Sequence, residues 1–138
     1  MSINNGWNKD FGIGMNNKEE DYTSLVKLCL DEKKDYLKFI EELEKKIKSF
    51  SITTSQLRKF YDMIFEVSDD ANDEEKKAIL YRMRILLEYA KGRRTIDENR
   101  EYKFFKQLIE ETMKNIDKFE LFKESFEAIV AFSKDKKR

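Results

Sequence analysis

Basic residues gather in one stretch of an otherwise neutral sequence. From residue 82 to residue 94, five basic residues stand against one acid, and six of the seven arginines lie between residues 58 and 100. A guanidinium group is planar, forms paired hydrogen bonds with phosphate and stacks on bases. This grouping is typical of a surface that holds a nucleic-acid backbone. The five residues are Arg82, Arg84, Lys91, Arg93 and Arg94.

A second interpretation fits the same residues. Cations near the C-terminal end of a helix stabilise it through the helix dipole, and Lys91, Arg93 and Arg94 stand near an expected helix end. Helical spacing places Arg82 at the edge of an apolar stripe, where it must pair with an acid or a phosphate. Composition alone leaves both a phosphate-binding surface and a solvated helix face open.

Other chemistries have little support. The chain has no histidine, which excludes Ser-His-Asp and Cys-His nucleophile pairs and every metal site that needs histidine. Asp69, Asp70 and Asp73 form an acidic turn, but without the ligand spacing, central glycine and closing glutamate of an EF-hand loop. No nucleotide-binding fingerprint occurs. We therefore predict no catalytic residue, no bound metal and no cofactor.

Composition predicts an all-α protein. The 138 residues suit one domain, and the 28 basic and 28 acidic residues cancel. Proline is absent and the only glycine after residue 14 is Gly92, too few turn residues for a sandwich, barrel or Gly-rich nucleotide fold. No apolar run approaches the roughly 20 residues of a membrane span. The single cysteine, Cys29, is expected in the core and indicates a reducing, cytoplasmic location.

We predict a compact bundle of about five helices over residues 19–138, preceded by a flexible arm over residues 1–18 that is rich in asparagine and glycine. The apolar residues of the arm could dock on the fold or grip a neighbouring subunit. The expected helices begin near residues 20, 54, 73, 96 and 119, and a charge-rich stretch at 31–35 could kink or break the first.

Local signals place the helix ends and the core. Capping boxes are expected at Thr53 with Gln56 and at Thr95 with Glu98, and Gly92 is expected in the left-handed conformation that ends the third helix. Phenylalanine spacing predicts core packing before base stacking. The other apolar positions expected in the core include Leu37, Ile40, Ile79, Leu80, Met83, Leu86, Leu87 and Ala90.

Two segments resemble landmarks of a known family. The sequence from Ile52 to Tyr61 resembles the motif that opens a helix in the small subunit of type III-A CRISPR effector complexes, the Csm small subunit. The sequence from Tyr89 to Arg93 resembles a second landmark of that family at a fitting distance downstream. The resemblance covers about residues 20–135.

The resemblance implies a non-catalytic subunit in antiviral defence. Family members stack as a helical filament and hold guide RNA and target RNA through the backbone, so the implied partners are both RNAs, other type III-A subunits and copies of itself. The matching basic positions are Arg58, Lys59, Lys91 and Arg93. Gln56 also matches, although capping explains it more simply. The charge pattern alone adds Arg82, Arg84 and Arg94.

Two other functions stay open. A helical adaptor that binds protein and no nucleic acid explains the neutral charge equally well. A small metal-assisted nuclease would need an activity that a chelator abolishes. RNA held by several phosphates should be released steeply by added salt, whereas an apolar helix partner should not.

Overall fold

The structure is a computed structural model that describes residues 21–133. The predicted arm at 1–18 and the last five residues of the predicted bundle, 134–138, lie outside the described residues. Within them the chain is entirely helical, without strands. The elements are α1 (Thr23–Cys29), α2 (Tyr36–Ile47), α3 (Thr54–Phe65), α4 (Asp73–Gly92), α5 (Glu101–Lys114), the short 3₁₀ helix η1 (Ile116–Lys118) and α6 (Phe119–Ser133).

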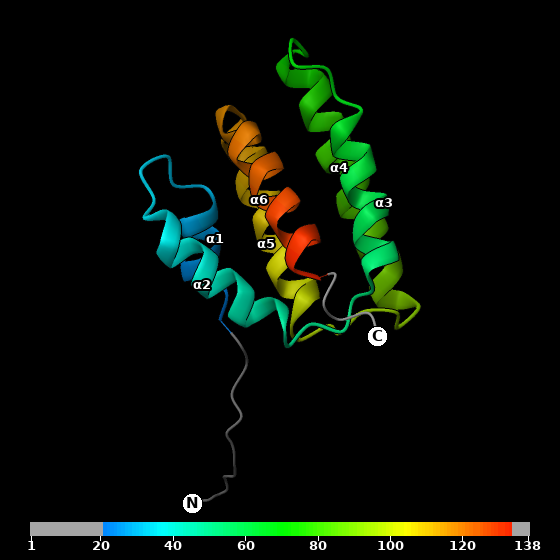
Figure 1. Cartoon of the computed structure of the whole chain (residues 1–138). Helices are drawn as coiled ribbons and strands as arrows, with labels where there is room; N and C mark the ends of the chain where they lie inside the picture. The colour runs from blue at the N-terminus through cyan, green and yellow to red at the C-terminus, as the bar shows by residue number, and fades with distance from the viewer. Residues whose placement is uncertain (1–20, 134–138) are drawn as a thin grey trace, which may run out of the picture.

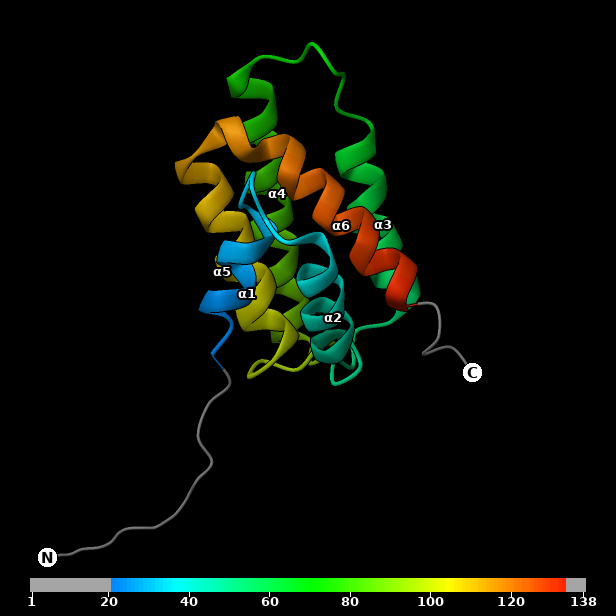
Figure 2. The ribbon, with the colours of Figure 1, turned by 60° about the vertical axis from the view of Figure 1, so that its left-hand side comes forward.

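The helices form three pairs (Figures 1 and 2). The pair α5 and α6 lies in the middle, with α1 and α2 on one side and α3 and α4 on the other. The main contacts follow this order, because α4 packs along α5, α3 packs along α6, and α1 and α2 pack on α5 and α6 respectively. The surfaces of α2 and α4 that face away from α5 and α6 therefore lie on opposite sides of the bundle.

The expectation of about five helices is wrong by one, because the charge-rich stretch at 31–35 breaks the predicted first helix. The ammonium of Lys34, a buried residue, donates to the Cys29 carbonyl at 2.9 Å, and Lys118 donates to the Leu30 carbonyl at 2.9 Å. These bonds satisfy carbonyls that the end of α1 leaves unpaired. The Asp35 side chain then accepts from the Lys38 amide at 3.2 Å and caps α2.

Aromatic rings fill the core, as predicted. Apart from Phe65, which is exposed, and Phe132, which is partly buried, every described phenylalanine is buried. Ring contacts link Phe50 to Phe105 and Phe105 to Phe126, with centres 6.2 and 5.4 Å apart. Edge-on and tilted ring pairs of this kind contribute about 0.5–1.5 kcal/mol each beyond their burial. Phenylalanine content here is a packing feature.

Three predicted core positions are exposed instead. Leu37 is 66% exposed, Ile40 41% and Leu86 43%. The break at 31–35 changes the rotation of α2 relative to α1, so α2 buries Phe39, Leu43 and Ile47 and its stripe does not continue that of α1. In α4 the buried positions are Leu80, Met83 and Leu87, while the predicted core residues Ile79 and Ala90 are only partly buried.

The end of α4 also differs from the prediction. Gly92 is the last helical residue, and Arg94 takes the left-handed conformation with φ at 60°. The amides of Thr95 and Arg94 donate to the carbonyls of Ala90 and Lys91, both at 3.0 Å. This pattern is a Schellman motif with an arginine at the position that usually holds glycine. The turn after Gly92 leads to Ile96, which is buried in the core.

One of the two predicted capping boxes is confirmed and the other is wrong. Thr53 and Gln56 form the predicted box at α3. The predicted box at Thr95 and Glu98 is wrong, since the Thr95 hydroxyl instead donates to the Ala90 carbonyl at 3.2 Å and α5 begins at Glu101.

Glu101 joins two loops that are far apart in the sequence. Its carboxylate is 0% exposed and accepts from the Ser51 amide at 3.0 Å, the Ser51 hydroxyl at 2.7 Å and the Asp97 amide at 3.0 Å. Such hydrogen bonds to a charged acceptor are worth about 1.5–3 kcal/mol each. This carboxylate therefore fixes the loop before α3 to the loop after α4.

Helix-end chemistry gives the first prediction. Gly92→Ala should raise the free energy of unfolding by about 0.5–1 kcal/mol, because alanine favours the helix and nothing lies within 4 Å of the added Cβ. Arg94→Gly should also stabilise, by about 1 kcal/mol, since glycine adopts positive φ without strain. Urea denaturation measures both. Destabilisation by Arg94→Gly would show that this backbone carries no strain.

The buried carboxylate gives the second prediction. Glu101→Ala should lower the free energy of unfolding by about 2–4 kcal/mol, because the Ser51 and Asp97 amides lose their acceptor. Glu101→Gln, which keeps one acceptor oxygen, should cost less. A reduction by Glu101→Ala below about 0.5 kcal/mol, the range of ordinary surface substitutions, would contradict the role given to this residue.

Candidate nucleic-acid interface

One end of the bundle collects four of the seven candidate basic residues. The Gln56 side-chain amide donates to the Thr95 carbonyl at 3.5 Å, and Arg100 donates to the Ser49 carbonyl at 3.2 Å. These hydrogen bonds, with those of Glu101, join the start of α3 to the loop that follows α4 (Figure 1). We call this part of the molecule the basic end, defined by Arg58, Lys59, Arg93 and Arg94.

Arg58 and Lys59 lie in the second turn of α3. The neighbouring Leu57 and Phe60 are buried, so the two cations fall on the outer side of the helix and are exposed. Neither forms an ion pair or a side-chain hydrogen bond with another of the residues 21–133. Exposed cations without an acidic partner are free to contact phosphate.

Arg93 and Arg94 extend the basic end beyond α4, and both are exposed. The Arg93 guanidinium donates to the Tyr89 hydroxyl at 3.1 Å and lies 5.6 Å from the centre of that ring. A ring contact of this kind orients the guanidinium without neutralising its charge. This supporting role of Tyr89 was not predicted from the sequence, although the spacing of four residues on one helix is a signal for it.

Arg84 and Lys91 belong to an internal network instead. Arg84 contacts Glu88 at 2.8 Å and Glu110 at 2.9 Å. Lys91 contacts Glu88 at 3.2 Å and lies 4.5 Å from the centre of the Tyr102 ring. Both charges are therefore balanced by acids that join α4 to α5, which makes them weaker candidates for binding phosphate.

Glu88 is the centre of that network. It accepts a short hydrogen bond from the Tyr102 hydroxyl and a second from Arg84. These two hydrogen bonds, in that order of effect, lower the pKa of Glu88 to about 2. Glu88 thus stays ionised well into the acidic range and keeps its partners in place.

Arg82 stands apart from both groups. It is exposed on α4, about three helical turns from Arg93. It forms no ion pair with the other described residues, so the acid predicted as its possible partner is not found among them. Its neighbours on the helix surface are Ile85 and Leu86, both of them exposed.

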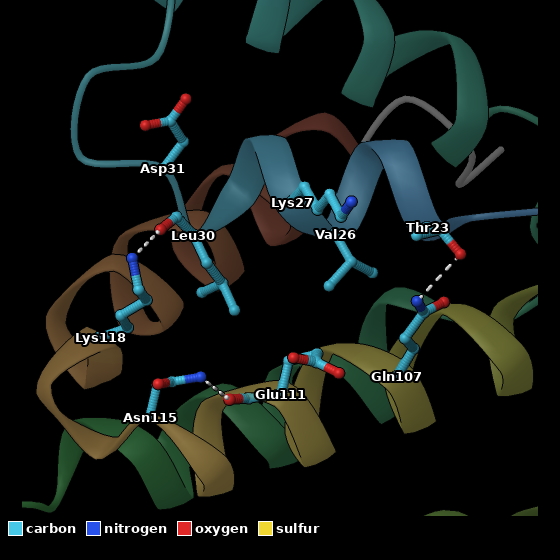
Figure 3. A pocket seen from close by; sticks show the side chains of 9 residues that line it. All are labelled: Thr23, Val26, Lys27, Leu30, Asp31, Gln107, Glu111, Asn115 and Lys118. Atoms are coloured by element: carbon cyan, nitrogen blue, oxygen red, sulfur yellow. Dashed lines mark hydrogen bonds between the residues drawn. The ribbon is translucent and has the colours of Figure 1, made fainter.

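The groove between α1 and α5 contains none of the seven candidates (Figure 3). It encloses about 400 Å³. Several of its polar groups already bond to the protein, because Gln107 donates to the Thr23 hydroxyl at 3.1 Å and Lys118 donates to the Leu30 carbonyl. Without a set of unpaired groups that converge on one point, the groove offers no distinct binding chemistry.

Metal ligands, the cysteine thiol and membrane-spanning helices can also be examined among the described residues. No three cysteine, aspartate or glutamate side chains among residues 21–133 are grouped to hold a metal ion. Cys29 is buried, and burial raises the pKa of its thiol to about 12, as suits a core residue. None of the helices in the described part is both long and apolar enough to cross a membrane.

The network predicts a pH dependence. Because the pKa of Glu88 is lower in the folded chain than its ordinary value of 4.5, its stabilising effect is complete above pH 4.5 and disappears as the pH falls towards 2. Glu88→Gln should therefore flatten the fall in the free energy of unfolding across this window, measured by urea denaturation. Glu127→Gln, at an exposed position on α6, is the control. Equal slopes for the two variants would contradict the network.

Comparison with known proteins identifies a family. A family model described as Csm2 Type III-A matches residues 31–138. No curated protein and no solved structure matches the chain significantly. The family match spans α2 to α6 and includes both segments in which the sequence resembles the Csm small subunit. The chain therefore belongs to the Csm2 family of type III-A CRISPR small subunits.

Proposed function

We propose that this protein is a non-catalytic subunit that holds guide and target RNA through the phosphate backbone, within a type III-A effector complex in the cytoplasm. Copies of it stack along the complex, and together with other type III-A subunits they line the RNA. Family membership supports the assignment to the complex. The contact with RNA is our inference from the surface.

The observation that carries the proposal is the basic end. Four cations from two segments about 35 residues apart in the sequence are exposed at the same end of the bundle, and none has an acidic partner among the described residues. The carboxylate of Glu101 holds the two segments together. We assign the RNA contacts to Arg58, Lys59, Arg93 and Arg94, and give Arg84 and Lys91 a secondary, structural part.

The chemistry of these groups suits sequence-independent binding. Contacts with phosphate fix the position of a nucleic acid without reading its bases, which a subunit that must accept any guide requires. A few such contacts per copy bind weakly, and their effects combine when copies stand side by side on one RNA. The net charge of zero would limit capture of unrelated RNA by single copies.

One specific observation favours the adaptor hypothesis, in which the protein binds another protein and no nucleic acid. Apolar side chains are exposed on α2 and α4, including Leu37, Ile40, Ile85 and Leu86. Clustered apolar exposure indicates contact with protein. It is compatible with an RNA-binding subunit that also touches other subunits, so salt dependence has to separate the two functions.

Charge reversal tests the proposal. Arg58→Glu combined with Arg93→Glu should weaken RNA retention by the assembled complex and lower the slope of log affinity against log salt by about two, one for each phosphate that the variant no longer binds. Filter binding at several salt concentrations measures the slope. Helicity should be unchanged, because both side chains are exposed.

A matched control carries the same change of charge elsewhere. Lys27→Glu combined with Lys33→Glu alters two exposed lysines, one on α1 and one in the loop that follows it, and should leave the slope unchanged. α1 lies on the other side of α5 and α6 from α3 and α4 (Figure 1). Equal weakening in both double variants would reveal a general effect of net charge. No weakening in either would favour the adaptor. Reduced helicity in the first variant would show that its arginines are structural.

A further inference from the structure

α4 has an exposed strip that combines apolar and basic groups. Arg82, Ile85, Leu86 and Tyr89 follow the spacing of one helix face, at i, i+3, i+4 and i+7. Tyr89 is 61% exposed, and Tyr81 beside the strip is 59% exposed. We call Arg82, Ile85, Leu86 and Tyr89 the α4 strip. Single exposed apolar residues are common. α4, however, exposes four large ones, which indicates a surface that a partner covers; these are Tyr81, Ile85, Leu86 and Tyr89.

α2 has a strip with the same spacing and the opposite charge. Leu37, Ile40, Glu41 and Glu44 stand at i, i+3, i+4 and i+7, and we call them the α2 strip. Tyr36, beside it at the start of the helix, is 66% exposed. The apolar part of this strip has no cover from the described residues.

The charges of the two strips are complementary. Between residues 76 and 96 the only acid is Glu88, and it already binds Arg84, Lys91 and Tyr102. Arg82 forms no ion pair with any acid of its own helix, whose other acids, Asp73, Glu74 and Glu75, lie in the first turn. Likewise, Glu41 and Glu44 form no ion pair with the other described residues. An acidic side chain of another molecule would pair with Arg82 of the α4 strip. A cationic side chain of another molecule would pair with Glu41 and Glu44 of the α2 strip.

We propose that the α4 strip packs against the α2 strip of a second copy of this chain, with Arg82 beside Glu41 and Glu44 of that copy. This inference rests on the stacking of copies in the proposed function, and it names the two surfaces that meet. The helices that carry the strips, α2 and α4, lie on opposite sides of the bundle (Figures 1 and 2). A contact between two different surfaces leaves one of each free at the ends, so copies add head to tail in a row.

The side chains around Arg82 favour protein over RNA at this strip. Ile85 and Leu86 present aliphatic groups that gain by leaving water but form no hydrogen bond with phosphate. The basic end, by contrast, has exposed cations and no large exposed aliphatic group within it. We therefore separate Arg82 from the RNA contacts and assign it to the contact between copies.

Cross-linking tests the pairing of surfaces. One full-length chain carries Leu86→Cys and a second carries Leu37→Cys, and both are mixed with a short bismaleimide, alone and within the assembled complex. The native Cys29 is 0% exposed and should not react. We expect the mixed product to exceed either self-product at least tenfold in the complex. Dominant self-products, or no mixed product in either setting, would overturn the inference.

A charge exchange provides the second measurement. Arg82→Glu should weaken self-association at least tenfold in sedimentation velocity or lower the yield of the mixed cross-link, and adding Glu41→Arg and Glu44→Arg should restore it. Lys77→Glu, on α4 but outside the strip, is the control and should have no effect. Failure of the exchange to restore association would overturn the inference.

The outcomes also separate this inference from the proposed function. If Arg82→Glu lowers RNA affinity without changing the mixed cross-link, the strip is an RNA contact, the inference is wrong and the proposed function stands. If the cross-link forms as expected but the complex retains RNA independently of the basic end, the contact between copies stands and the RNA assignment fails.

Discussion

The hydrogen bonds of the Glu101 carboxylate are the interactions on which the geometry of the basic end depends. This carboxylate lies at the start of α5 and accepts hydrogen bonds from two loops whose residues are far apart in the sequence. One loop leads into α3 with Arg58 and Lys59, and the other follows α4 with Arg93 and Arg94. A buried carboxylate is costly unless it is fully hydrogen-bonded, so this geometry is well specified. The basic end follows from that constraint.

The remaining charges divide by helix pair. Between α4 and α5, Arg84, Lys91 and Glu88 balance one another and support packing. Arg82, on the part of α4 that faces away from α5, has no ion pair with the described residues. Glu41 and Glu44, on α2 at the other side of the bundle, have none either. A chain with no net charge can thus carry the separate charged surfaces to which we assign RNA and neighbouring copies in our proposals. Net charge alone conceals this division.

Much of the fold was predictable because local signals and core spacing agree. The box at Thr53 and the phenylalanine spacing predicted helices that the structure contains. The failures occur where a distant contact decides. Lys118 donates to the Leu30 carbonyl at the end of α1, and α4 ends at Gly92 in a turn whose left-handed residue, Arg94, leads to the buried Ile96. The role of Glu101 could not be predicted, because its partner Ser51 lies 50 residues away in the sequence and only the fold brings the two together. The candidate arginines were identifiable by type, but their acidic partners were not.

The most direct test of the RNA assignment is to identify which peptides touch RNA. The complex is purified from native cells, irradiated with ultraviolet light, and its cross-linked peptides are identified by mass spectrometry. We predict that RNA attaches to peptides from the start of α3 and from the loop after α4, and not to those from α2 or from the middle of α4. Cross-links confined to α2 and the middle of α4, or a complex that contains this chain but no RNA, would contradict this assignment.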